Sequence, residues 1–196
     1  MHERTTRAEA FGRVLAAGGG IAVAGVTIAV VAEPAGSKLS PAQDAAILNF
    51  ALLIEYVQAG FYADALRRGR LTGELGEFAR TVGAQERAHV AFLRKALGTK
   101  ARKPPKLDFG DDTTSPDRFT DAALKLEDLA VVGYNAGAPN LTKPALANAA
   151  KIVSVEARHA SWIRAIAGVT PAPDAAEPQV SAQRVLKTLQ GSGYIK

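Results

Sequence analysis

Two histidines of this chain each follow a glutamate by three residues. The pairs are Glu86-Arg-Ala-His89 and Glu156-Ala-Arg-His159. Because residues three apart lie on one face of a helix, each pair can direct a carboxylate oxygen and an imidazole nitrogen toward one point. Two such pairs, with one more glutamate from each of two other helices, form the ligand set of a dinuclear metal site. The spacing therefore predicts a metal centre built on helices.

Two further glutamates, Glu55 and Glu127, can supply the remaining carboxylates, since each lies within an apolar helical stripe. Each also precedes one of the Glu-x-x-His pairs at a similar spacing, so the two halves of the chain repeat each other. The repeat predicts a pseudo-twofold axis with the ligands at its centre. We expect the two motif glutamates to bridge the ions. We expect Glu55 and His89 to complete one end of the site, and Glu127 and His159 to complete the other. This pairing depends on the order of the helices, and the sequence leaves it open.

The ligand types indicate which metal the site would take. Cysteine is absent, which excludes thiolate ligands, iron-sulfur clusters and disulfides. Carboxylates with one imidazole per metal favour two iron or two manganese ions, with O2 or peroxide as the reaction partner. The rival hypothesis is a metal-free remnant with protonated or salt-bridged carboxylates. Its nearest cations, Arg87 and Arg158, are each one residue from a ligand and should point elsewhere on their helices.

Aromatic residues accompany the predicted ligands. Tyr62 and Tyr134 each follow a lone glutamate by seven residues, and Tyr56 and Trp162 lie on or beside ligand-bearing faces. The three tyrosines are candidates for a catalytic role, because they could relay electrons or donate hydrogen bonds to ligands. The simpler interpretation is that these side chains fill the core.

Four helices must position these residues. Ser40-Pro41 and Ser115-Pro116 each place a capping serine before a proline that fits a first turn. The predicted helices run from Ser40-Pro41 to about Arg68, from about Leu75 to Gly98, from Ser115-Pro116 to a break over Asn135 to Pro144, and from about Lys143 to Ala167. No strand-period pattern competes. The predicted fold is all-α, an antiparallel four-helix bundle over residues 40–168.

Two polar segments lie outside these helices. Residues 99–115, rich in proline, aspartate and lysine, predict a long connection between the second and third helices that is too polar to be a core element, and the basic cluster within it, over residues 100–106, predicts a solvated linker. Residues 169–196 predict a C-terminal extension. Within it the short amphipathic piece Val180 to Leu189 would either pack as an extra helix or stay mobile.

Residues 1–32 have the composition of a targeting segment. An apolar run over 14–32 follows three arginines, and Val30 and Ala32 suit the positions before a signal-peptidase cleavage site. We therefore expect an exported protein, periplasmic or extracellular. Because the run is also about long enough to span a bilayer, the alternative is a protein anchored by an uncleaved N-terminal helix.

The chain has 24 basic and 19 acidic residues, a mild excess. The only basic cluster, over residues 100–106, contains no aromatic residue or recognised motif, so we expect no nucleic acid partner. The exposed faces of the bundle leave a homodimer open.

These residues, read in order, resemble the ferritin-like superfamily, and most closely its exported, desiccation-associated branch. The resemblance covers about residues 40–167. It rests on Leu48-Asn49-Phe50-Ala51-Leu52, Tyr56, Phe61-Tyr62, Glu127-Asp128, Tyr134 and Val155-Glu156-Ala157-Arg158-His159-Ala160. It implies the bundle and six ligands: Glu55, Glu86, His89, Glu127, Glu156 and His159.

The resemblance indicates an activity only weakly, because a fold alone does not fix function. The leading hypothesis is a di-metal oxidoreductase, a ferroxidase or a peroxidase or catalase-like protein, that acts in iron handling or oxidative stress. The alternative is a non-enzymatic metal-binding or structural protein of desiccation stress. Whether the protein is an enzyme is left open by the sequence.

Overall fold

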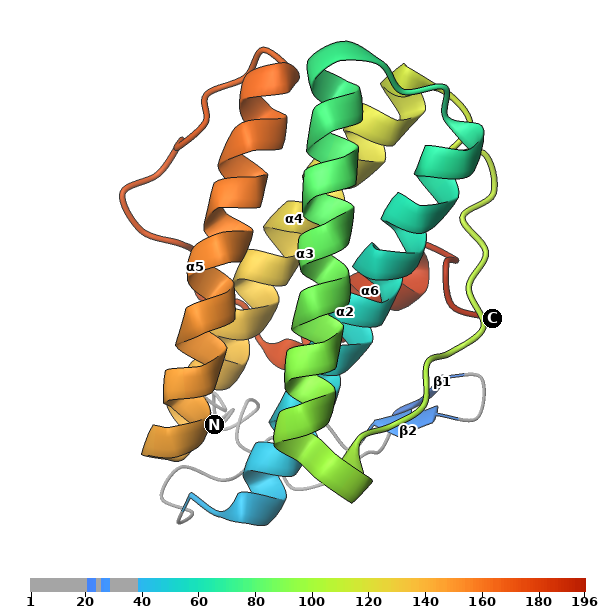
Figure 1. The fold of residues 1–196 in the computed structure, drawn as a ribbon. Coiled ribbons are helices and arrows are strands. Elements are labelled where there is room, and N and C mark those ends of the chain that lie inside the picture. The colour runs from blue at the N-terminus through green and yellow to red at the C-terminus, as the bar shows by residue number, and fades with distance from the viewer. Residues whose placement is uncertain (1–20, 24–25, 29–38) are drawn as a thin grey trace, which may run out of the picture.

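The computed structural model describes residues 21–23, 26–28 and 39–196, and its long elements are all helices. Four of them lie side by side (Figure 1). These are α2 (Pro41–Arg68), α3 (Gly73–Leu97), α4 (Pro116–Gly137) and α5 (Lys143–Ile166). A shorter helix, α6 (Ala182–Gly191), follows near the C-terminus, and single 3-10 turns lie at Gly98–Lys100 and Ala138–Asn140. The predicted all-helical fold is confirmed for residues 39–196.

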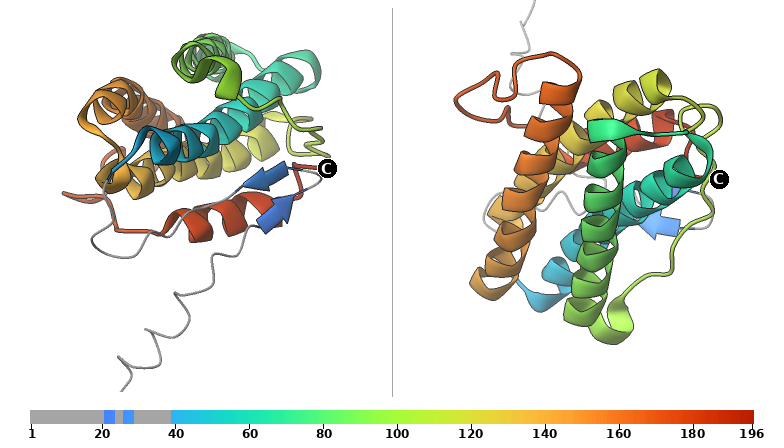
Figure 2. Two further views of the ribbon diagram at one scale, coloured as in Figure 1. Left: turned by 90° about the horizontal axis from the view of Figure 1, so that it is seen from below. Right: turned by 45° about the horizontal axis from the view of Figure 1, so that its top comes forward.

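The helices form layers. Seen along the bundle, α3 and α5 make one side, α2 and α4 lie in the middle, and α6 covers the far side (Figure 2). A short turn joins α2 to α3 and another joins α4 to α5, and in each pair the chain reverses direction. Residues 101–115 run the length of the bundle between α3 and α4 (Figure 1). Because of this long crossing, the successive helices α3 and α4 run in the same direction.

Local capping explains where two of the helices start. Ser40 accepts a hydrogen bond from the backbone N–H of Gln43 at 3.2 Å, and Pro41 occupies the first turn of α2. Ser115 caps α4 in the same manner through Arg118 N–H at 3.4 Å. These side chains satisfy backbone donors that have no partner within the helix. Both predicted helix starts are confirmed.

Helix α2 is the core of the molecule, because every side chain from Leu48 to Gln58 is buried. A helix that is buried on all sides needs apolar residues all round. By length and composition α2 is apolar enough to cross a membrane, but most of it lies inside the bundle. Its buried position leaves Glu55 and Gln58 without contact with water.

The connection over residues 99–115 differs from the prediction. Phe109 and Thr113 are buried, and Phe109 packs edge-on against Phe61 of α2 with ring centroids 5.6 Å apart. Leu107 forms an isolated antiparallel bridge with Ile195. The prediction that residues 99–115 contribute nothing to the core was therefore wrong at Phe109 and Thr113. The segment is polar on average, but a few apolar side chains suffice to attach it to the bundle.

The break between the third and fourth helices is shorter than predicted. Helix α4 continues to Gly137, and α5 already begins at Lys143. The N–H of Ala138 still bonds to the carbonyl of Tyr134, so the helical pattern persists through Asn135. Pro144 does not interrupt α5, because a proline in the first turn lacks only an N–H that would have no helical partner.

The C-terminal segment packs on the bundle. Val185, Leu186 and Leu189 of α6 belong to the main hydrophobic core, and the Tyr194 hydroxyl donates a hydrogen bond to Asp112 at 2.6 Å. Of the two predicted outcomes for this amphipathic piece, packing as an added helix is the one observed.

Two short strands, β1 (Ile21–Val23) and β2 (Val26–Ile28), pair in an antiparallel ladder. They fall within the apolar run 14–32, and the rest of that run lies outside the described residues. The export signal and the membrane anchor therefore stay predictions.

Candidate metal centre

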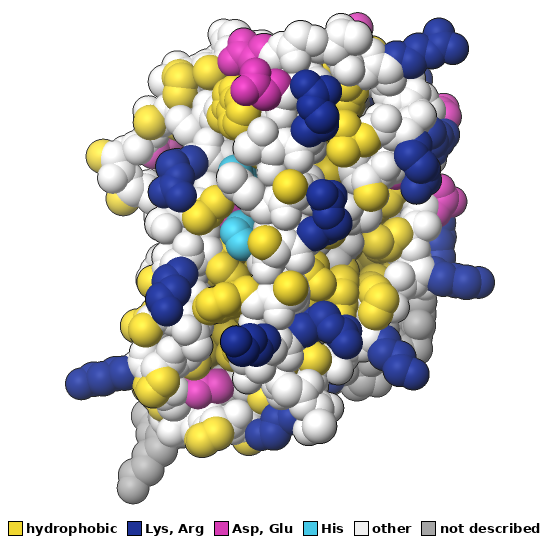
Figure 3. Space-filling model, in the orientation of Figure 1, with side chains coloured by type: hydrophobic (Ala, Val, Ile, Leu, Met, Phe, Trp, Pro, Cys, Tyr) yellow, Lys and Arg dark blue, Asp and Glu magenta, His cyan; other side chains and the backbone are white. Residues whose placement is uncertain are grey.

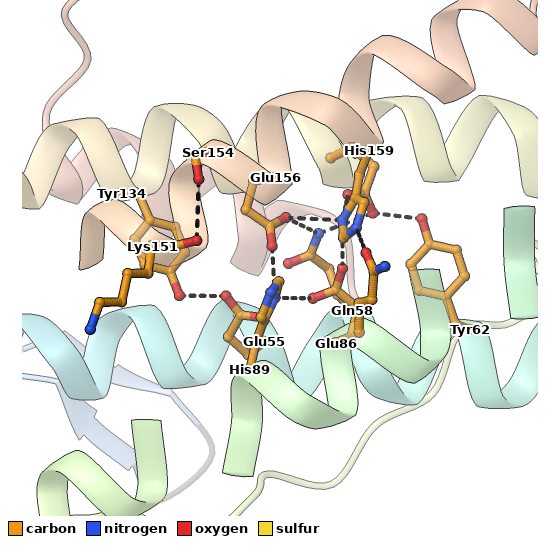
Figure 4. Close-up of polar contacts among 12 residues, drawn as sticks. Glu55, Gln58, Tyr62, Glu86, His89, Tyr134, Lys151, Ser154, Glu156 and His159 are labelled. Carbon is orange, nitrogen blue, oxygen red and sulfur yellow. Dashed lines mark hydrogen bonds and ion pairs between the residues drawn. The ribbon is translucent and has the colours of Figure 1, made fainter. Parts of the chain in front are cut away.

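The structure brings the six predicted ligands together in the middle of the bundle. Figure 4 labels all of them except Glu127. Helices α2 and α4 contribute one glutamate each, and α3 and α5 contribute one Glu-x-x-His pair each. The four glutamates are fully buried, whereas His89 and His159 keep 8% and 3% of their surfaces exposed. Carboxylates of four different helices thus share one water-excluded space.

The ligand atoms form two groups that could each hold a metal ion, with the atoms of each group within 4.8 Å of one another. One group is Glu55, Glu86, His89 and Glu156, and the other is Glu86, Glu127, Glu156 and His159. Both groups contain Glu86 and Glu156, so these two carboxylates lie between the two positions. The geometry also answers what the sequence left open, because Glu55 lies with His89 and Glu127 with His159.

The two motifs interlock across the centre. His89 Nδ1 lies 2.9 Å from an oxygen of Glu156 but 3.3 Å from its own motif partner Glu86. His159 Nδ1 is likewise closer to Glu86, at 3.0 Å, than to Glu156, at 3.8 Å. Each imidazole therefore faces the carboxylate of the opposite helix, and the site itself joins α3 to α5.

Two tyrosines hold the terminal glutamates. The Tyr134 hydroxyl of α4 donates to Glu55 Oε1 of α2 at 2.5 Å, and the Tyr62 hydroxyl of α2 donates to Glu127 Oε1 of α4 at 2.5 Å. The pairing is crossed, since each tyrosine serves the glutamate of the other helix. Hydrogen bonds of this kind fix the orientation of a ligating carboxylate.

Tyr56 and Trp162 are not part of the centre. The Tyr56 hydroxyl accepts a hydrogen bond from Arg94 at 2.7 Å and donates one to the carbonyl of Arg102 at 3.0 Å. Its predicted catalytic candidacy has no support in this geometry. Trp162 donates through Nε1 to Glu74 at 3.1 Å, at the edge of the seam between α5 and α3.

Sequence reasoning missed two glutamines. Gln58 is fully buried and its Nε2 lies 3.0 Å from Glu127 Oε1 and 3.4 Å from Glu156 Oε2. A signal existed, because Gln58 follows Glu55 by three residues and so repeats the motif spacing. Gln85 is exposed on α3, and its Oε1 lies 2.5 Å from His159 Nε2. No sequence pattern pointed to that contact.

The Gln85 contact bears on the proton of His159. When a metal ion is bound, a proton kept on Nε2 and donated to the Gln85 oxygen would leave the lone pair of Nδ1 for the ion. A histidine that ligates a metal commonly donates its other N–H in this way.

Without a cation, protons compensate the clustered charge. Burial lowers the pKa of His89, but hydrogen bonds to Glu156 and Glu55 outweigh it and raise the pKa to about 12. The pKa of His159 rises to about 11 through Glu127, Glu156 and Glu86, again against its burial. Both rings are therefore imidazolium ions at neutral pH in the metal-free protein.

The carboxylates respond unequally. Burial raises the pKa of Glu55 well above its usual value, and the nearby charge of Glu86 adds to that effect. Burial also raises the pKa of Glu127, to about 7. For Glu86 burial acts in the same direction, but hydrogen bonds from His159 and His89 prevail and lower the pKa to about 2. The carboxylate between the two imidazoles thus stays charged.

The residues fit a pair of metal ions. One oxygen of each of the four glutamates accepts no well-directed hydrogen bond in the described chain, although imidazole nitrogens lie within ion-pair distance of these carboxylates. Nδ1 of His159 also lacks a well-directed hydrogen bond. Buried polar atoms normally have such partners. The atoms concerned are Glu55 Oε2, Glu86 Oε1, Glu127 Oε2 and Glu156 Oε1. Carboxylate oxygens and imidazole nitrogens left without partners are the donors that iron and manganese accept.

Comparison with known proteins agrees with this arrangement. A family model described as a ferritin-like domain matches residues 43–169, more than half of the chain and all six ligand positions. No curated protein matches the chain. The match does not reach the narrower desiccation-associated branch, which stays a prediction.

Proposed function

The chain belongs to the ferritin-like domain family, and from this premise we propose that it binds two iron or manganese ions within an antiparallel four-helix bundle. We propose further that it oxidises ferrous iron or consumes O2 or peroxide. The observation that carries the proposal is the pair of buried ligand groups that share Glu86 and Glu156. Two redox-active ions held there would each supply one electron to O2 or peroxide.

The chain's own residues prepare this site. Glu86 and Glu156 would bridge the ions, and each end would be completed by one glutamate and one histidine. Tyr62 and Tyr134 hold the terminal carboxylates, so these ligands lose little freedom when a cation binds. The bundle excludes water from the glutamates, which strengthens their attraction for a cation.

Metal content is the first test. Protein purified without chelators, or loaded anaerobically with ferrous iron, should contain about two ions per chain. The variant Glu86→Ala/Glu156→Ala should lose them, because both positions lack their shared ligands. The matched control Glu77→Ala/Glu177→Ala removes two exposed glutamates and should keep the metal. Retention of two ions by the first variant would show that the ligand assignment is wrong.

Reactivity separates an enzyme from a structural metal site. The ferrous-loaded protein should consume O2 or peroxide faster than free ferrous iron does, as followed by an oxygen electrode and absorbance. A loaded protein that binds two ions but reacts no faster would favour the non-enzymatic role, in which the metal only joins the helices.

We also propose export, because of the basic and apolar pattern of residues 1–32. Fractionation of cells that express the full chain, with N-terminal sequencing of the product, tests it. A product that begins near residue 33 outside the cytoplasm supports a cleaved signal. Full-length protein in the membrane fraction supports an anchor, and full-length cytoplasmic protein contradicts both.

A further inference from the structure

Helices α3 and α5 carry a one-sided distribution of charge. Beyond Glu77, their only carboxylates are Glu86 and Glu156, and both are buried in the metal centre. Their exposed charges from there on are basic. We call this set the basic face: Arg80, Arg87, Arg94 and Lys95 of α3, with Lys143, Lys151 and Arg158 of α5.

The basic face keeps its charge. No carboxylate of the described residues lies within 4.0 Å of any of the seven cations of the basic face. The ion pairs that lysines and arginines do form involve residues outside the basic face, among them Arg67, Arg68, Arg164 and Lys196. Arg94 makes a hydrogen bond, but its partner is the neutral hydroxyl of Tyr56. Helix α4 differs, because acidic residues such as Asp117 and Asp121 alternate there with Arg118 and Lys125. Along α3 and α5 the exposed charge beyond Glu77 is therefore of one sign.

The metal centre approaches the surface on this same side. His89 and His159 are its only ligands with any exposed surface. Figure 3 shows the histidine atoms at the surface between lysine and arginine side chains on either side. Gln85, itself exposed, covers Nε2 of His159. The shortest way from solvent to the ligands therefore crosses the basic face.

We propose that the basic face is the entrance for a small anionic substrate of the metal centre, a carboxylate or an oxyanion, which passes beside Gln85. This inference rests on the proposed metal centre. A surface of one sign concentrates ions of opposite charge and raises their rate of arrival. The centre itself would favour such a ligand after oxidation, because two trivalent ions exceed the charge of the four carboxylates.

Trp162, the only tryptophan, reports on this surface without any metal. It follows Arg158 by one helical turn and packs edge-on against Phe78 of α3 at 5.3 Å. At constant ionic strength, fluorescence quenching by iodide should fall roughly two-fold in Arg87→Glu/Arg158→Glu, since reversed charges repel the anion. Quenching by neutral acrylamide should not change. The matched control Arg184→Glu/Lys187→Glu reverses two exposed cations on α6, on the far side of the bundle (Figure 2).

Access to the centre is tested with iron-loaded protein and azide, a small anion whose binding to ferric iron changes the absorbance. At about 20 mM salt the azide association rate should fall about three- to ten-fold in Arg87→Glu/Arg158→Glu and stay unchanged in the α6 control. At about 500 mM salt the difference should largely disappear.

The outcomes are distinct. Iodide quenching that is equal in wild type and variant would overturn the basic face as an anion-collecting surface. An azide rate that is unchanged in the variant, or no azide binding by iron-loaded protein, would overturn the entrance alone. Failure to bind iron would refute the proposed function, and with it the entrance, whatever the quenching shows.

Discussion

The hydrogen bond from Tyr134 to Glu55 provides a quantitative test of the site. Among the described residues, Tyr134 donates the only hydrogen bond that Glu55 Oε1 accepts, and Tyr134→Phe removes it. A hydrogen bond to a charged group is worth about 1.5–3 kcal/mol. Since each 1.4 kcal/mol is about a factor of ten in an equilibrium constant, metal affinity should fall roughly 10- to 100-fold. This agrees with the loss usually seen when a residue that supports a metal ligand is removed.

Tyr62→Phe should have a smaller effect, although the two tyrosines are related by the internal repeat. Its acceptor, Glu127 Oε1, keeps a second donor in Gln58 Nε2 at 3.0 Å. We therefore expect a loss of about tenfold or less. Tyr56→Phe is the matched control, because its hydroxyl bonds outside the centre, and it should change metal affinity less than about two-fold.

The assay is an anaerobic competition for ferrous iron or Mn2+ between each variant and a chromogenic chelator, with circular dichroism to verify folding. We expect a fixed order of affinity loss, with the largest loss in Tyr134→Phe, a smaller one in Tyr62→Phe and the smallest in Tyr56→Phe. A Tyr134→Phe protein that folds and binds metal within two-fold of wild type would refute it. So would a larger loss in Tyr62→Phe than in Tyr134→Phe.

Four further predictions concern protons and packing. Metal binding at pH 7 should release protons from His89 and His159, because pKa values of about 12 and 11 keep both rings charged in the metal-free protein. A pH indicator that records no proton release would contradict this prediction. In the metal-free protein the raised pKa values of both histidines contribute stability that is complete below pH 6.5. The free energy of unfolding, measured with urea, should therefore decrease as the pH rises from 7 through about 11. Gly83→Ala should cost about 1–3 kcal/mol of unfolding free energy, because its new Cβ would lie 2.8 Å from Tyr62 Cβ, whereas Gly191→Ala meets open space and should cost nothing. Leu186→Ala should cost about 2–5 kcal/mol, since α6 packs in the core, and a loss below 1 kcal/mol would show that α6 is peripheral.

Much of the scaffold was predictable because its signals are local. A serine followed by a proline marks a helix start through hydrogen bonds made within one turn, and both such starts were found. The errors fell where distant residues decide. Phe109 lies in a polar stretch and is buried because Phe61 of α2 and Tyr194 near the C-terminus pack against it. The predicted break begins at Asn135, whereas helix α4 ends only at Gly137.

By itself, the sequence determined the six residues of the centre. The three-residue spacing of each Glu-x-x-His pair places both side chains on one helical face, and their apolar surroundings turn that face inward. Helical periodicity is a property of a single segment, so it can be seen without knowing its neighbours.

Only the tertiary structure decided how these helices meet. It assigned Tyr134 to Glu55 and Tyr62 to Glu127, which are 79 and 65 residues apart in the chain. It also placed Gln85 on His159 and assembled the basic face above the histidines. Such contacts depend on the order and direction of packed helices, which are fixed by burial over the whole core rather than by any local pattern.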